Sequence, residues 1–97
     1  MYDKPGALEY DPRKNELNIR TRGISFESVR RFEFSKAIVW VDDRHDYGEV
    51  RYVAIGPIGG RIHALCFTEK AAGIRVLSLR KANPREVSRY AQINSID

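Results

Sequence analysis

The chain has 97 residues, enough for one domain with a single hydrophobic core. Its 17 lysines and arginines against 13 aspartates and glutamates give a net charge of +4, which suits an acidic partner without requiring one. No apolar stretch approaches the roughly 20 residues of a membrane span, and the start lacks a signal-peptide pattern. We therefore expect one cytoplasmic domain, residues 1–97, with no membrane contact and no disulfide, because Cys66 is the only cysteine.

The first third of the chain carries helix signals. After a short strand at residues 8–10, Asp11 can cap a helix whose first position is Pro12, and Gly23 supplies its C-terminal stop. Ser25 is placed to cap a second helix. The apolar residues of that second helix follow at helical spacing: Phe26, Val29 and Phe32.

The remainder of the chain is rich in predicted strands. Apolar and β-branched runs predict four strands, at residues 37–41, 50–58, 61–68 and 73–80. The polar segment 42–49 contains Gly48 and predicts a hairpin loop, and turns are expected at 57–60 and 69–73. Short connections favour an antiparallel meander.

A last helix is expected after Asn83, which can cap it, with Pro84 at its first position and Val87 and Tyr90 on an apolar stripe. The predicted fold is α+β: a small antiparallel β-sheet meander with two N-terminal helices and one C-terminal helix on one face. The other face would be open to polar side chains.

The last predicted strand carries Arg75 within it and ends on Arg80 and Lys81. Arginine suits phosphate because its rigid fork can donate two parallel hydrogen bonds. Arg75 and Arg80 lie five residues apart, so an unbroken strand would point them to opposite sides. Either Arg80 lies beyond the strand end or only one of the two is in a site. Each could instead form an ion pair with a carboxylate such as Glu49 or Glu86.

Short runs distributed over most of the chain carry a resemblance to a known family. They are Glu9-Tyr10-Asp11-Pro12 with Lys14 and Asn18, Gly23 to Glu27, Asp43 to Glu49 with Arg51, Ala54-Ile55-Gly56, Ile74-Arg75, Ser78, Arg80-Lys81-Ala82, Glu86 and Tyr90. In their order and spacing the chain resembles the BrnT family of bacterial type II toxins, small ribonucleases with a RelE-like fold. The resemblance implies an mRNA-cleaving toxin neutralised by a ribbon-helix-helix antitoxin of the BrnA type. It also implies that operator DNA is bound only through the toxin–antitoxin complex.

Two positions depart from the family pattern. Thr21-Arg22-Gly23 stands where the family usually has Lys-His-Gly, so Arg22 replaces a histidine that could transfer protons. Arginine cannot act as a base near neutral pH, although it can neutralise a phosphate. Tyr10 stands where a tryptophan is typical, which keeps a surface for stacking.

RNA can be cleaved without metal by attack of the 2′-hydroxyl on the adjacent phosphorus, with proton transfer and with cations that stabilise the phosphoryl oxygens. We expect no cofactor and no metal, because His45 and His63 are 18 residues apart without a ligand pattern around them. The expected catalytic residues are Arg75, Arg80, Lys81, Lys14 and His45, and the expected RNA-binding residues are Arg22, Arg51, Arg85 and Tyr10.

Several of these residues also allow a simpler interpretation. Lys14 can be a solvated helix residue, and His45 a surface loop residue. Arg51 and Glu49 share strand parity and could orient each other. At the level of function, a ribonuclease toxin competes with a non-catalytic module that binds an antitoxin and helps it repress. Arg22 favours the module, whereas the retained arginines favour the enzyme.

Overall fold

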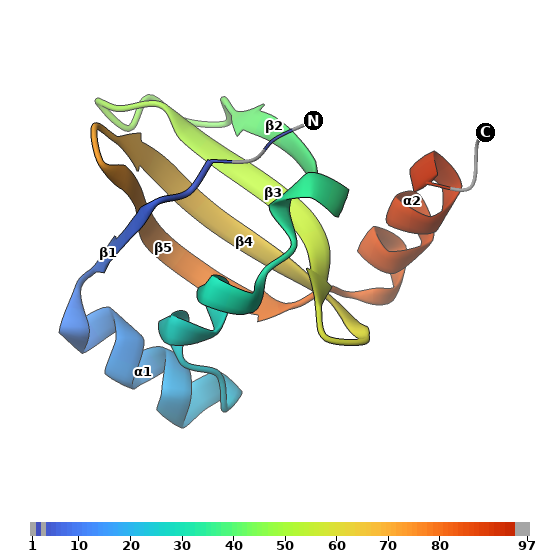
Figure 1. The fold of residues 1–97 in the computed structure, drawn as a ribbon, viewed down its shortest axis with the longest axis horizontal. Coiled ribbons are helices and arrows are strands. Elements are labelled where there is room, and N and C mark those ends of the chain that lie inside the picture. Colours follow the sequence, from blue (N-terminus) through green and yellow to red (C-terminus); the bar gives the residue numbers. More distant parts are fainter. Residues whose placement is uncertain (1, 3, 95–97) are drawn as a thin grey trace.

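The computed structural model describes Tyr2 and residues 4–94, which form a mixed five-stranded sheet with helices at both ends of the chain (Figure 1). The elements, in chain order, are β1 (Ala7–Tyr10), α1 (Pro12–Arg22), the 3-10 helices η1 (Phe26–Arg31) and η2 (Phe34–Lys36), β2 (Ile38–Asp42), β3 (Arg51–Ile58), β4 (Arg61–Lys70), β5 (Gly73–Lys81) and α2 (Pro84–Asn94). None of the described helices is long and apolar enough to cross a membrane.

The sheet has the strand order β1-β5-β4-β3-β2. Strands β2 to β5 form the predicted antiparallel meander, but β1 adds to its edge in parallel with β5, with Ala7 opposite Gly73. The prediction of a purely antiparallel sheet is therefore wrong. A strand at the start of the chain pairs here with the last strand, and such a long-range partner leaves no local signal in the sequence.

The predicted strand bounds are close to the observed ones, with differences at the loops. The second strand begins and ends one residue later than expected, so Asp42 belongs to β2 and not to the hairpin loop. The fourth strand continues to Lys70, which shortens the following turn. In both strands the added residues are polar, and they extend the backbone pairing that the apolar residues begin. The β-propensity of these polar residues alone does not predict that they belong to a strand.

The second N-terminal helix predicted after Ser25 is not an α-helix. Ser25 does cap the segment, and its Oγ accepts a hydrogen bond from the Glu27 amide at 3.1 Å. The segment is instead the 3-10 helix η1, and the chain leaves it at Phe32. Its buried residues Phe26 and Val29, with Phe32 after them, are spaced three apart. That spacing matches the three residues per turn of a 3-10 helix and puts all three on one side.

The predicted start and stop of α1 are confirmed. Asp11 accepts a hydrogen bond from the Arg13 amide, Pro12 is the first helical residue, and Gly23 ends the helix with a left-handed φ of 70°. Asn18 is buried on the inner side of α1, where its Nδ2 donates to the carbonyls of Ile24 and Leu79, each at 2.9 Å. These two bonds fix α1 against β5.

One face of the sheet carries the hydrophobic core. The 3-10 helices lie over this face (Figure 1). The buried residues of this cluster come from η1, η2, the link between them and the three central strands: Phe26, Val29, Phe32, Phe34, Ala54, Leu65, Phe67, Ile74, Val76 and Leu79. In β4, His63, Leu65 and Phe67 share one side of the strand, and all three are buried on the core side of the sheet.

The opposite face is covered only in part. Helix α2 projects from the end of β5 and contacts β3, with the Tyr90 hydroxyl donating to the Lys36 carbonyl at 2.7 Å and the Arg89 guanidinium 5.2 Å from the Trp40 ring (Figure 1). No described residue of α2 is fully buried, and Val87 on its predicted apolar stripe is exposed. The prediction that all helices lie on one face of the sheet is therefore wrong for α2, and only the rest of this face is open to polar side chains as expected.

Candidate functional site

A polar hollow of about 380 Å³ lies on the sheet face opposite the core. Four cationic side chains line it: Lys14 from α1, Arg44 from the β2–β3 loop, Arg51 from β3 and Arg80 from β5. The remaining lining residues are Asp42, Tyr47, Val53, Ala64, Leu65, Cys66, Leu77 and Ser78. The concentration of cations around a small polar hollow fits an anion with several oxygens.

Strand register places the residues at the base of this hollow. Val53 of β3 is paired with Cys66 of β4, which is paired in turn with Ser78 of β5, so the three form a row across the sheet. Cys66 is partly buried, and this burial raises the pKa of its thiol. The thiol is therefore kept in its protonated, unreactive form near neutral pH.

A β-bulge decides which way the two arginines of β5 point. Cys66 is opposite Ser78 while Phe67 is opposite Val76, so Leu77 is an extra residue in β5. Arg75 is opposite Thr68 and Arg80 opposite Ala64, and both partners have the same parity as Cys66. The strand is thus not unbroken, and Arg75 and Arg80 lie on the same face although they are five residues apart.

Sharing a face does not bring Arg75 into the hollow. Its Nη1 donates to the Glu9 carboxylate on β1, the residue directly opposite it in the parallel pair. Arg80 lies at the other end of the strand and lines the hollow, where its guanidinium forms two hydrogen bonds with Glu86. The ion pair considered from the sequence is therefore found for both arginines, with Glu86 as the partner of Arg80.

Asp42 organises the side of the hollow formed by the β2–β3 loop. Its side chain, 3% exposed, accepts hydrogen bonds from Arg44 Nε at 2.7 Å, from Arg44 Nη2 at 2.8 Å and from the Tyr47 hydroxyl at 3.2 Å. The Arg44 hydrogen bonds hold the pKa of the Asp42 carboxyl well below its usual range. Asp42 is therefore an anion that fixes its neighbours, and is unsuited to accept a proton at neutral pH.

The same loop positions Arg51. The Tyr47 ring lies 4.0 Å from the Arg51 guanidinium, and Arg51 Nε donates to Glu49 at 3.3 Å. Glu49 and Arg51 thus orient each other, as their shared parity suggests. Asp42, Arg44 and Tyr47 were not singled out from the sequence. Arg44 and Tyr47 belong to the run Asp43 to Glu49, which carries part of the family resemblance, and this run was the available indication that they are functional. Asp42 lies just before the run.

His45 lies near the hollow without lining it. It is exposed, and its ring meets the edge of the Tyr47 ring at a centroid distance of 5.6 Å. The imidazole thus contacts Tyr47, whose ring also contacts the Arg51 guanidinium, but is not among the residues that line the hollow. Among the described residues, no three histidine, cysteine, aspartate or glutamate side chains come together as a potential metal site.

Three further candidates, Lys81, Arg85 and Tyr10, lie outside the hollow. Lys81 and Arg85 are exposed, on the last residue of β5 and in the first turn of α2. The Tyr10 hydroxyl donates to Glu27, and its ring packs against Phe26 on the core side. These contacts give Tyr10 a structural role in joining β1 to η1.

Arg22 lies on α1 at the far end from Lys14. The two positions are eight residues apart, on the same face of the helix and about 12 Å apart along its axis. Arg22 Nη1 donates to Asn18 Oδ1 at 3.1 Å, so the guanidinium is attached to the buried asparagine that joins α1 to β5. The structure thus brings together Lys14, Arg51 and Arg80 of the predicted residues, and leaves Arg22 apart from them.

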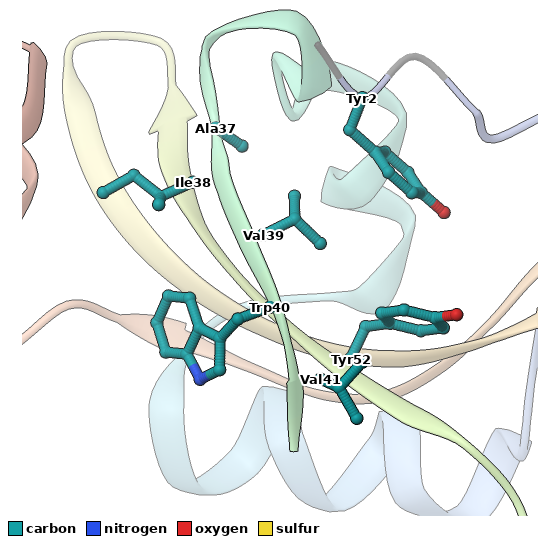
Figure 2. Close-up of a pocket in the computed structure, with 7 residues that line it drawn as sticks. All are labelled: Tyr2, Ala37, Ile38, Val39, Trp40, Val41 and Tyr52. Carbon is teal, nitrogen blue, oxygen red and sulfur yellow. The ribbon is translucent and has the colours of Figure 1, made fainter. Parts of the chain in front are cut away.

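A second hollow, of about 490 Å³, follows the edge strand β2 (Figure 2). The side chains around it are apolar or aromatic and none is charged: Tyr2, Ala37, Ile38, Val39, Trp40, Val41 and Tyr52. Without a cation it offers a phosphate group no charge complement. The polar hollow is therefore the candidate site.

A family model described as the ribonuclease toxin BrnT of type II toxin–antitoxin systems matches residues 10–86. These residues include Lys14, Arg51 and Arg80, and they extend to Glu86 at their last position. No match was found among curated protein sequences.

Proposed function

Because the chain belongs to the BrnT family of ribonuclease toxins of type II toxin–antitoxin systems, we propose that the polar hollow is the place where RNA is bound and cleaved. The observation that carries this proposal is the convergence of Lys14, Arg51 and Arg80 from three separate elements. Cations from one element often mark a solvated surface, whereas cations gathered from three elements around a hollow mark a site for an anion.

In this proposal Arg51 and Arg80 stabilise the negative charge that develops on the phosphoryl oxygens as the 2′-hydroxyl attacks phosphorus. The Tyr47 ring behind Arg51 and the Glu86 carboxylate behind Arg80 hold the two guanidinium groups in place. Charges held in position before the reaction cost no reorganisation during it, which is what makes such groups effective.

Lys14 has a different part in the proposal. Guanidinium groups keep their protons near neutral pH, whereas an ammonium group can give one up. We assign to Lys14 the donation of a proton to the 5′-oxygen that leaves, while the proton of the attacking 2′-hydroxyl passes to solvent water. The cleavage proposed here needs no metal ion and produces a 2′,3′-cyclic phosphate, because the 2′-oxygen becomes bonded to phosphorus as the 5′-oxygen departs.

The test compares two neighbouring residues of α1. Lys14→Ala removes a cation from the hollow, and Arg13→Ala removes a cation from the exposed surface of the same helix. With purified protein and single-stranded RNA in EDTA, Lys14→Ala should lower turnover by about 10²-fold, because general acid catalysis contributes on this order. Arg13→Ala should leave turnover close to that of the parent.

The products complete this test. End analysis should find 2′,3′-cyclic phosphate or the 3′-phosphate formed from it. Activity that disappears in EDTA and returns with Mg²⁺, or products with 3′-hydroxyl ends, would contradict the metal-free mechanism. Equal turnover for the two alanine variants would remove Lys14 from the site.

As a toxin of a type II system, the protein has a cognate antitoxin and an RNA substrate. We propose that the antitoxin is a ribbon-helix-helix protein of the BrnA type and that operator DNA is bound only through the complex. The product of the neighbouring gene, once purified, should stop RNA cleavage and give operator binding that the toxin alone lacks.

The replacement of the family histidine by Arg22 supports a second candidate function, a toxin homologue that has lost catalysis and serves only to bind the antitoxin. The same assay separates the two. A folded protein that binds its partner but leaves RNA intact at every pH between 5 and 9 would be the module.

A further inference from the structure

The guanidinium of Arg80 is held from behind by a carboxylate of the C-terminal helix. Arg80 Nη1 donates to Glu86 Oε1 at 2.7 Å, and Nη2 donates to Glu86 Oε2 at 2.9 Å. The two bonds are parallel and occupy the end of the guanidinium fork. The Glu86 side chain is 20% exposed, so little water competes for these bonds.

Glu86 is itself held in position by the start of α2. Its Oε1 accepts a hydrogen bond from the Asn83 amide at 2.9 Å, while Asn83 Oδ1 accepts one from the Glu86 amide at 2.8 Å. This reciprocal capping box was predicted from the sequence as a helix start. In the structure the same carboxylate completes the cap and binds Arg80, so one side chain links α2 to the hollow.

The pairing decides which edge of Arg80 can meet a ligand. A guanidinium has five N–H groups, and Glu86 takes one from each terminal nitrogen. Nη1 also donates to the Lys81 carbonyl at 3.4 Å. Among the described residues no partner is found for Nε–H, which leaves the edge formed by Nε and Nη2 able to donate two parallel hydrogen bonds to a phosphate.

We propose that Glu86 is a positioning residue for RNA cleavage, which holds Arg80 so that its Nε and Nη2 edge faces the phosphate while Glu86 itself does not contact RNA. The inference rests on the proposed function of the polar hollow. Arg80 keeps the pKa of the Glu86 carboxyl below its ordinary value, chiefly through these hydrogen bonds. Glu86 is therefore an anion at neutral pH, and its charge opposes the approach of RNA.

This opposition gives the role a distinctive kinetic signature. Glu86→Gln keeps an acceptor for the Asn83 amide and for one Arg80 N–H, but removes the negative charge and the second ionic hydrogen bond. Binding of RNA should be equal or tighter, because a repulsive charge is lost. Turnover should fall, because a guanidinium that is no longer fixed spends less time in the reactive geometry, and misplacement of this kind costs on the order of 10–10²-fold.

The experiment measures KM and kcat for single-stranded RNA with five proteins: the parent, Glu86→Gln, Arg80→Ala, the double variant and Asn83→Ala. We expect Glu86→Gln to lower kcat at least about tenfold with KM unchanged or lower. In the Arg80→Ala background the same change should have no further effect on kcat, because there is no guanidinium left to position. Asn83→Ala is the matched control, since it removes the other half of the capping box and leaves the Arg80 contact intact.

The possible outcomes separate the inference from the proposed function. If Arg80→Ala turns over RNA like the parent, the hollow is not the cleavage site and both fail. If Arg80→Ala is impaired while Glu86→Gln matches the parent, the positioning role alone is overturned. It is equally overturned if Asn83→Ala lowers kcat as much as Glu86→Gln, or if Glu86→Gln lowers kcat further without Arg80. Thermal melting of each variant confirms that the compared proteins are folded.

Discussion

Strand β5 carries an arginine toward each of its ends, on the same face of the sheet, and the surroundings of the two differ. Arg75 pairs with Glu9, a residue of the edge strand β1 whose side chain is 54% exposed. Arg80 pairs with Glu86, whose side chain is 20% exposed and is also fixed by a helix cap. The side chains of the two arginines are similarly exposed, at 35% and 41%.

Under the proposed function, the partner and not the exposure of the arginine distinguishes the two ion pairs. An exposed pair such as Arg75–Glu9 contributes little because water and salt screen it. The Arg80 guanidinium is held at two atoms by Glu86 and lines a hollow with three other cations, Lys14, Arg44 and Arg51. In the proposal, this position beside the hollow gives Arg80 a role that Arg75 does not have.

Removal of each arginine in turn is the strongest way to break this comparison. Arg80→Ala should lower kcat for RNA cleavage by about 10²–10³-fold, which is the usual loss when one preorganised group that stabilises transition-state charge is removed. Arg75→Ala should change kcat less than about threefold, because its guanidinium is occupied by Glu9 outside the hollow. The measurement is steady-state cleavage of one RNA at fixed salt.

Both variants lose one positive charge, so the pair controls for net charge. Equal losses in kcat would mean that the whole face of β5 acts on RNA and that the bulge at Leu77 serves to direct both arginines to it. A loss for Arg75→Ala alone would place the cleavage site at the β1 end of the strand.

The salt dependence of binding sharpens the same comparison with a smaller effect. Each phosphate contact to single-stranded RNA contributes a slope of about −0.7 to the plot of log affinity against log salt concentration. Arg80→Ala should flatten the slope by about one such contact, and Arg75→Ala should leave it unchanged. Fluorescence anisotropy with a non-cleavable RNA that carries 2′-methoxy groups measures the slope without turnover.

An unchanged slope for Arg80→Ala would show that Arg80 does not contact phosphate in the bound state. A flatter slope for Arg75→Ala would extend the RNA path toward β1. Glu9→Gln offers a further check, because it frees Arg75 and should steepen the slope only if RNA passes over this end of the strand.

Features with local causes could be predicted from the sequence. Asp11, Pro12 and Gly23 define α1 because caps and stops act within one turn, and the four strands of the meander follow from short apolar runs and turns. The 3-10 character of η1 was missed although the spacing of Phe26 and Val29 contained it, since three-residue spacing also occurs on α-helices.

Features that depend on distant partners could not be predicted. The parallel pairing of β1 with β5 joins the two ends of the chain, and the bulge at Leu77 depends on how β4 and β5 align. The direction of Arg75 and Arg80 follows from that bulge, so the sequence left it open. Asp42 was placed in a loop, and its contacts with Arg44 and Tyr47 depend on a strand end that propensity did not reveal.

The smallest effect is expected at Arg22, the position where the resemblance to the family implies a histidine. Arg22 is attached to Asn18 and lies about 12 Å along α1 from Lys14, outside the residues that line the hollow. An imidazole is shorter than an arginine side chain, so Arg22→His should bring no titrating group to the hollow. We expect kcat to change less than about threefold across pH 5 to 9, where a working histidine would add an inflection near its ordinary pKa of about 6.5. Cleavage measured over this pH range for the parent and for Arg22→His provides the test, with Arg20→His on the exposed side of the same helix as the matched control.

A rise in kcat with a new inflection for Arg22→His alone would show that the cleavage site reaches this end of α1 and that the parent protein works with a weakened form of that site. A fall for Arg22→His alone would identify Arg22 as a phosphate ligand and extend the RNA path along the helix, away from the end of β5 that carries Arg80.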